Sequence, residues 1–188
     1  FNLEAFVHSQ EVENLVVDYY AVEEKDKTTQ LVVAGVPKAM LAFVLEALTR
    51  ARVDPVAIDL DLFALFNATM RAGLLGEYGT GLVVSLAPRF SKVLSLENGA
   101  LRAARFLRIG MNGDLDRSVA SLSRELNRFL LSRPVHEPLR DVFLTGNLDD
   151  AQFEQLSAGL KSKLGMEIHN IDARARLDLK GLDEDTSA

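Results

Sequence analysis

The stretch LVVSLAPRFSKVLSLENGALRAARFLRI, residues 82–109, decides the fold of this chain. Its apolar and β-branched runs predict two or three strands folded back on one another. Asn98-Gly99 lies between two of these runs, and this dipeptide is typical of a two-residue hairpin turn because both of its residues accept positive φ angles. We therefore expect an antiparallel hairpin at the centre of the chain.

Downstream of the hairpin, the clearest periodic pattern predicts a helix. A loop at residues 110–113 is followed by Asp114, whose carboxylate can accept hydrogen bonds from the free amides of a first helical turn. Apolar residues then recur at spacings of four and three, which places them on one helix face: Leu115, Val119, Leu122, Leu126 and Phe129. That face must pack on a sheet.

Three more elements follow this helix along the chain. They are a strand at 141–145 that enters the Gly146-Asn147 turn, a helix at 149–164 that Gly165 ends, and a strand at 166–170. Residues 173–188 have no periodic apolar face, so we expect them to form a flexible tail.

Upstream of the hairpin, the order of elements predicts a small α/β unit. Its predicted parts are strands at 15–22, 30–34 and 53–60, a helix from Pro37 to about Arg50, and a helix at 62–71 that Asp61 caps and Gly73 ends. The apolar run at 30–34 is nearly continuous, which is typical of a strand covered on both faces. Three glycines in residues 74–81 mark a domain boundary.

Composition indicates an ordinary soluble globular protein. The 188 residues are 48% hydrophobic and 26% charged. A net charge of -6 without any basic stripe argues against nucleic acid as the main partner, since phosphate binding needs a clustered excess of Lys and Arg. The chain has no cysteine, and no apolar run reaches the roughly 20 residues of a membrane span. Because the sequence starts at Phe1 rather than Met, we expect a piece of a longer protein.

Few side chains predict catalysis or metal binding. The histidines, His8, His136 and His169, are far apart and have no second ligand at helical spacing, so we predict no metal site and no nucleophile. Asp59 and Asp61 alternate and could act as paired carboxylates, but a solvated strand end and a helix cap explain them better. Tyr19 and Tyr20 are explained equally well by a partner surface and by a half-buried strand.

The turn at residues 87–90 carries two nearby cations, Arg89 and Lys92. A functional anion site would add glycines that let backbone amides approach a phosphate. Ala87 and Pro88 occupy this turn instead, and Pro88 has no amide hydrogen to donate. We therefore interpret Arg89 and Lys92 as solvated hairpin charges.

Taken in order, these patterns resemble the PilM family, the cytoplasmic actin-like proteins of type IV pilus assembly, which are related in fold to FtsA. The resemblance covers most of residues 15–170. It rests on VDPVAIDLDLFAL at 53–65, and on the succession of hairpin, Ile109-Gly110 loop, long helix, VFLTG at 142–146, helix and Leu164-Gly165.

This resemblance implies an α/β fold of the actin-like ATPase (ribonuclease H-like) class. Residues 1–75 would be a small α/β subdomain inserted into the first lobe, together with a helix that returns to that lobe. Residues 76–172 would be the second lobe, which contains the central hairpin, and residues 173–188 a tail. The first phosphate-binding hairpin of the family would precede Phe1.

The resemblance also implies a degenerate nucleotide site. Related ATPases have an acid that positions hydrated magnesium, then a glycine two residues later and Ser or Thr; here Ser85, Ala87, Pro88, Arg89 and Ser91 occupy this region. The glycine-rich adenosine motif becomes Gly146-Asn147-Leu148. We expect no catalytic residue, no metal and no cofactor; ATP with magnesium would bind only if segments outside this sequence supply the site.

The implied function is a non-catalytic scaffold of the type IV pilus platform, at the cytoplasmic side of the bacterial inner membrane. It would bind the cytoplasmic N-terminus of a PilN-like membrane protein, in a groove near residues 15–22 and 31–48, and other platform proteins. One alternative is the cytoplasmic domain of the type II secretion protein GspL, whose partner is the secretion ATPase. Another is an active ATPase or sugar-kinase-like enzyme.

Overall fold

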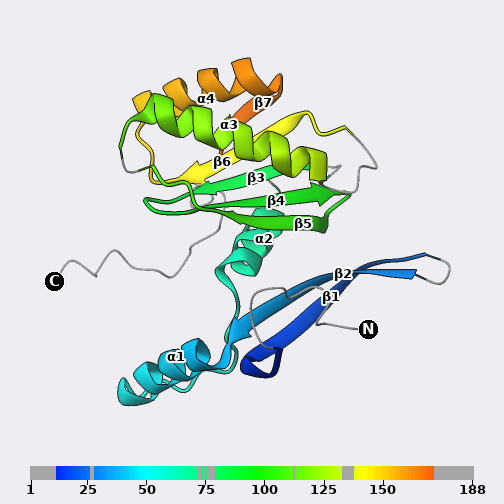
Figure 1. Cartoon of the computed structure of the whole chain (residues 1–188), viewed down its shortest axis with the longest axis vertical. Coiled ribbons are helices and arrows are strands. Elements are labelled where there is room, and N and C mark those ends of the chain that lie inside the picture. Colours follow the sequence, from blue (N-terminus) through cyan, green and yellow to red (C-terminus); the bar gives the residue numbers. More distant parts are fainter. Residues whose placement is uncertain are drawn as a thin grey trace. The chain divides into compact units, whose positions relative to one another are not determined.

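The computed structural model describes residues 12–25, 28–71, 73, 75, 79–111, 113–132 and 138–171. The chain divides into two compact units, Phe1–Asp59 and Leu60–Ala188 (Figure 1). His8, His136 and the predicted tail at 173–188 lie outside the described residues. The predicted boundary between an inserted subdomain at 1–75 and a second lobe at 76–172 is a different kind of division. It stays a prediction.

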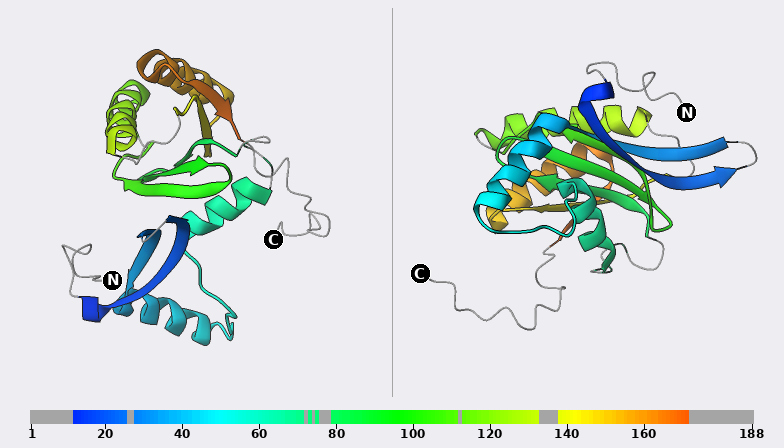
Figure 2. Two further views of the ribbon diagram at one scale, coloured as in Figure 1. Left: turned by 90° about the vertical axis from the view of Figure 1, so that its right-hand side faces the viewer. Right: turned by 90° about the horizontal axis from the view of Figure 1, so that it is seen from below.

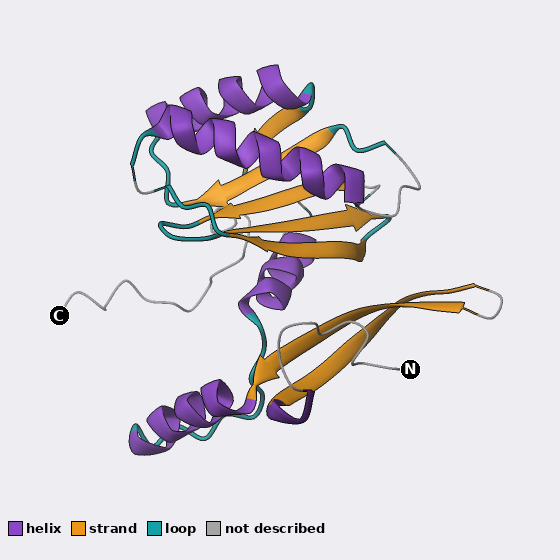
Figure 3. Ribbon diagram, in the orientation of Figure 1, coloured by secondary structure: helices purple, strands orange, loops and turns teal. Residues whose placement is uncertain are grey.

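The described part of the first unit contains one hairpin, one α-helix and a short 3-10 helix. After a short 3-10 helix at Val12–Asn14, β1 (Leu15–Lys25) pairs antiparallel with β2 (Thr28–Pro37), and α1 (Lys38–Arg50) follows directly (Figure 3). Pro37 is the N-cap residue of α1 rather than its first helical residue. Both strands are longer than predicted because β1 and β2 continue through polar residues toward their connection.

Two predictions for the first unit are wrong. None of its described side chains is buried, so the strand predicted at 30–34 is not covered on both faces. The strand predicted at 53–60 does not form, since a strand needs a neighbour for its backbone groups and the described sheet of this unit contains β1 and β2 alone. Arg52 leaves α1 with φ of 58°, and Val56 is fully exposed.

The second unit is a five-stranded sheet between helices. Its strands are β3 (Gly81–Leu86), β4 (Ser91–Glu97), β5 (Ala100–Leu107), β6 (Asp141–Gly146) and β7 (Glu167–Asn170), in the order β5-β4-β3-β6-β7. The first three are antiparallel, whereas β6 and β7 run parallel to β3. Helices α3 (Leu115–Ser132) and α4 (Asp150–Leu164) cover one face, and α2 (Asp61–Arg71) lies on the other (Figure 2).

The predicted central hairpin is confirmed as three consecutive strands. Asn98 and Gly99 have φ of 52° and 75°, so both turn residues are left-handed, and Glu97 pairs directly with Ala100. A turn of this kind matches the right-handed twist of the flanking strands. The dipeptide therefore fixes the pairing of β4 with β5 next to the turn, before the register shifts between Ser95 and Leu96.

The predicted helix faces form the core of the second unit. Val119, Leu122, Leu126 and Phe129 of α3 are buried against apolar residues of β3, β4 and β6, and Leu115 packs at the edge of this cluster. Burying side chains of this size is worth about 2 kcal/mol each, which is the main reason that α3 forms here.

The helix ends predicted at Asp114, Gly73 and Gly165 are confirmed, Gly73 having φ of 60° just after α2, whereas the start predicted at Asp61 is wrong. The Asp114 carboxylate accepts from the backbone N–H groups of Asp116 and Arg117 at 2.9 and 3.3 Å, and Gly165 ends α4 with φ of 66°. Asp61, however, is the first residue of α2 rather than its cap. Its carboxylate forms an ion pair with the Lys92 ammonium, which holds it away from the helix amides.

Candidate functional site

The turn at residues 87–90, between β3 and β4, is held against the loop that follows β5. The Met111 backbone N–H donates to the Ala87 carbonyl at 3.1 Å, and the Ser91 hydroxyl donates to the Ile109 carbonyl at 2.8 Å. Gly110 lies so close that a Cβ atom there would be 1.9 Å from the Pro88 carbonyl oxygen. We call residues 87–91 and 109–111 together the clamped turn.

The structure brings the second predicted motif to the same end of the sheet. In the parallel β3–β6 pair, Ser85 is opposite Thr145 and Leu86 is opposite Gly146. A Cβ atom at Gly146 would lie 2.6 Å from the Leu86 carbonyl oxygen, so the two strand ends approach more closely than a side chain would allow. Carboxyl ends of adjacent parallel strands are the usual place for a ligand in an open α/β sheet.

The N-terminus of α4 lies next to Gly146-Asn147 in the sequence, and its cap residue accepts from one of its free amides. Asp149 Oδ1 accepts from the Gln152 backbone N–H at 2.8 Å, and the Gln152 side chain returns a bond to the Asp149 N–H at 3.1 Å. This capping box places a carboxylate where a helix could otherwise bind a phosphate. It therefore disfavours an anionic ligand at this helix end.

The cations near the turn have different surroundings. Arg89 is exposed at the tip of the hairpin. Lys92 was predicted to be a solvated charge, and this prediction is wrong, because its ammonium contacts Asp61 of α2 and the side chain is mostly covered. Asp61 and Asp59 therefore do not serve as a pair of free carboxylates.

These residues do not fit a magnesium nucleotide. Position 85 presents a hydroxyl instead of a carboxylate, Pro88 offers no N–H, and the Ala87 carbonyl and Ser91 hydroxyl are bonded to residues 109–111. The clamped turn holds the two loops together, and these contacts engage the Ala87 carbonyl and the Ser91 hydroxyl.

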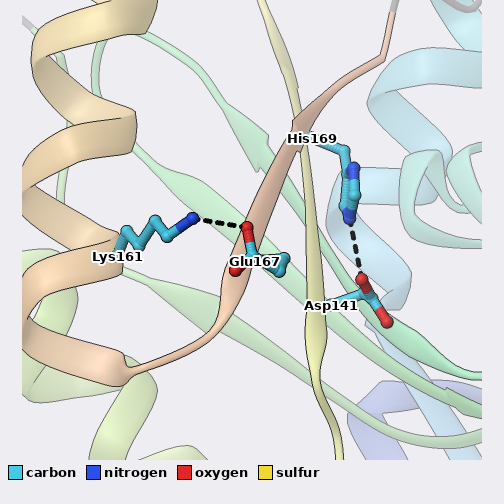
Figure 4. Close-up of polar contacts among 4 residues, drawn as sticks. All are labelled: Asp141, Lys161, Glu167 and His169. Carbon is cyan, nitrogen blue, oxygen red and sulfur yellow. Dashed lines mark hydrogen bonds and ion pairs between the residues drawn. The ribbon is translucent and has the colours of Figure 1, made fainter.

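A second polar cluster, which the sequence did not predict, fastens β7 to the sheet (Figure 4). His169 Nε2 lies 2.7 Å from Asp141 Oδ1, its ring stacks on Phe143 with centroids 4.9 Å apart, and Lys161 of α4 pairs with Glu167 at 2.6 Å. His169 and Asp141 are far apart in the sequence and meet only through the β6–β7 pairing. The cluster contains no hydroxyl or thiol side chain, and its charged groups are paired with one another, so we interpret it as a set of contacts that hold the sheet edge.

Two features are absent from the described residues. Their His, Asp and Glu side chains form no group of three or more that could hold a metal ion. Among the helices of the described ranges, none combines the length and the apolar content needed to cross a membrane.

Solved structures provide the decisive comparison. The chain is similar to a structure of the PilM-PilN type IV pilus biogenesis complex, with a TM-score of 0.73 and 20% sequence identity over 93% of this chain and 61% of that one. It is also similar to a Bacteroides thetaiotaomicron protein with an actin-like ATPase fold and unknown function, with a TM-score of 0.50 and 17% identity over 87% of this chain and 56% of that one. The chain has an actin-like ATPase fold.

The actin-like ATPase fold confirms the predicted fold class. The two comparisons also show what share of each matched structure this chain covers. At 20% and 17% identity, the likeness shows the fold and leaves activity and partners to be established by other means. The chain spans about three fifths of the length of either matched structure. No family model and no curated protein matches the sequence.

Proposed function

We propose that this chain is a non-catalytic, PilM-like scaffold of a type IV pilus platform, and that it binds the cytoplasmic N-terminus of a PilN-like membrane protein. One observation carries the proposal: the first unit exposes apolar side chains that no described residue covers. On α1, Met40 is 61% and Phe43 is 73% exposed. The most similar fold described above comes from a complex of PilM with PilN.

The exposed surface has features of a peptide-binding site. Phe43 and Ala47 line a groove of about 500 Å³ on α1, with Glu46 and Arg50 beside it and joined by an ion pair at 2.5 Å. Tyr19 on β1 is also 67% exposed. Aromatic and long apolar side chains commonly anchor a bound peptide, while charged neighbours set its orientation.

The clamped turn supports the non-catalytic part of the proposal. The bonds that join it to residues 109–111 stabilise its shape without any nucleotide. A missing stabiliser of transition-state charge commonly costs about 3 kcal/mol in the activation barrier. We infer that a turn of this sequence retains its structural role after its chemistry is lost, and that the protein acts at the cytoplasmic face of the inner membrane through its partner.

The test is calorimetry with a synthetic peptide from the N-terminus of a PilN-like protein. We expect binding, and we expect Phe43→Ser to weaken it about tenfold, since anchor residues carry most of the affinity of such interfaces. Leu131→Ser, which removes an 87% exposed side chain from α3, is the matched control. Absence of binding at high micromolar peptide, or an equal loss in the control, would contradict the proposal.

A separate measurement tests the proposal that the protein is non-catalytic. ATP binding is followed by calorimetry with and without magnesium, on the chain and on the longest protein that contains it. We expect no magnesium-dependent binding by the chain. Tight magnesium-dependent binding, together with hydrolysis, would favour the active ATPase instead.

A further inference from the structure

An arginine-lined groove crosses the second unit between β5 and α3. It has a volume of about 580 Å³, and four of its lining residues are arginines: Arg105 from β5, Arg108 directly after this strand, and Arg124 and Arg128 from α3. Glu125 is the one acid in the lining. The sequence predicted no basic stripe, and along the chain there is none; the pairing of β5 with α3 gathers these cations on a protein of net charge -6.

One guanidinium of the groove is already ordered by its neighbours. Arg105 Cζ lies 5.6 Å from the centroid of the Phe129 ring, and its Nη2 donates to the Ser132 hydroxyl at 3.3 Å. Stacking on an aromatic ring restrains the long side chain without neutralising its charge. A ligand therefore loses less side-chain entropy on binding Arg105 than on binding a free arginine.

The positive charge of the groove is only partly balanced. Glu125 pairs with Arg128 at 2.5 Å. In the described part of the chain no carboxylate pairs with Arg105, Arg108 or Arg124, and all three are exposed. Among the described residues, these three guanidinium groups thus face solvent without a carboxylate partner.

The cations of the groove come from two elements. Arg105 lies near the end of β5 and Arg108 directly after this strand, while Arg124 and Arg128 are one helical turn apart on α3. A ligand that carries several carboxylates can therefore pair with more than one guanidinium of the groove.

The strand beside the groove can also receive a peptide backbone. β5 is the last strand of the sheet order, so within the described residues one of its edges is unpaired. Edge strands bind extended peptides through main-chain hydrogen bonds, and side chains then supply the specificity.

We propose that the β5–α3 groove binds an extended acidic segment of a partner protein, with its backbone along the free edge of β5 and carboxylates paired to Arg108 and Arg124. This site lies entirely within the second unit. It is separate from the surface on α1 and does not depend on the function proposed above.

The test is fluorescence anisotropy with a labelled peptide of about eight residues that alternates Glu and Thr, added to the intact chain. We expect binding that weakens with salt, and a loss of roughly tenfold in affinity for the double variant Arg108→Gln/Arg124→Gln. The control variant Arg71→Gln/Arg140→Gln removes the same charge from exposed arginines outside the groove lining and is expected to bind as the parent does. Both variants replace exposed side chains, and circular dichroism checks that they fold.

Three outcomes would overturn this proposal. They are equal affinity of the two double variants, equal binding of a peptide in which Gln replaces Glu, and tighter binding of inorganic phosphate or of a short oligothymidine than of the acidic peptide. The PilN-like peptide is measured on the same proteins. Its binding is expected to be unchanged by Arg108→Gln/Arg124→Gln, so failure of one proposal is distinguishable from failure of the other.

Discussion

At the scale of single residues, Gly110 decides whether the clamped turn can close. Its backbone lies against Pro88, with 1.9 Å between the position of a Cβ atom and the Pro88 carbonyl oxygen. The obstacle is backbone, so a side-chain rotation cannot relieve it. We expect Gly110→Ala to destabilise the second unit by about 1–3 kcal/mol, as overpacking does elsewhere, and urea unfolding followed by circular dichroism measures it.

A matched glycine gives the control for this experiment. At Gly35, on β2, a Cβ atom would meet Leu15 Cδ1 at 3.4 Å, which is an ordinary contact. Gly35→Ala should therefore change the free energy of unfolding by less than about 1 kcal/mol. Equal effects of the two substitutions would mean that the close approach of residues 109–111 to the turn is not required for stability.

At the scale of elements, the packing of α4 on α3 depends on one small residue. A Cβ atom at Gly159 of α4 would lie 2.6 Å from Cγ1 of Val119, a buried residue of α3. We expect Gly159→Ala to cost about 1–3 kcal/mol, because the two helices would have to separate. Since the obstacle is a side chain, Val119→Ala should relieve it in the double variant. A thermodynamic cycle from urea unfolding then gives a coupling energy of about 1 kcal/mol or more, whereas simple additivity would contradict this packing argument.

Elements were predictable from the sequence where their cause is local. Asn98-Gly99 determines the β4–β5 turn, and the apolar period of α3 determines which face is buried. The strand predicted at 53–60 has a suitable composition and fails for lack of a neighbour, which no local pattern reveals. Local patterns also do not reveal the contact of His169 with Asp141 or the groove that brings arginines of β5 and α3 together. Both features join residues that are far apart in the sequence.

The candidate site was predictable only in part. Ser85 and Gly146 were expected in one site through the resemblance to PilM, and the β3–β6 register places Leu86 next to Gly146. The bonds from Met111 and Ser91 that seal the turn were not expected. Gly110 was the one residue in the sequence that pointed to this contact. A single glycine does not identify the loop that its backbone approaches.

At the scale of the whole molecule, the two units differ in how they are stabilised. The described side chains of Phe1–Asp59 include no buried residue, whereas β3, β4 and β6 of the second unit carry apolar side chains with no exposed surface, such as Val84, Val93 and Leu144. Regions with few buried apolar contacts open at a lower free energy. We therefore expect amide hydrogens of β1, β2 and α1 to exchange faster than those of β3 and β6, by about a hundredfold or more, in a hydrogen-exchange experiment read by mass spectrometry.

The same hydrogen-exchange experiment distinguishes two reasons for fast exchange in the first unit: a low intrinsic stability, and the absence of a bound partner. A ligand that binds only the folded form stabilises it by about 2.7 kcal/mol at a hundredfold excess over the dissociation constant. Saturating PilN-like peptide should therefore slow exchange about a hundredfold in α1 and its neighbouring strands and leave β3 and β6 unchanged. The acidic Glu-Thr peptide should instead slow exchange along β5. Protection of the second unit by the PilN-like peptide, with none on α1, would place the partner on the wrong unit and contradict the proposed function.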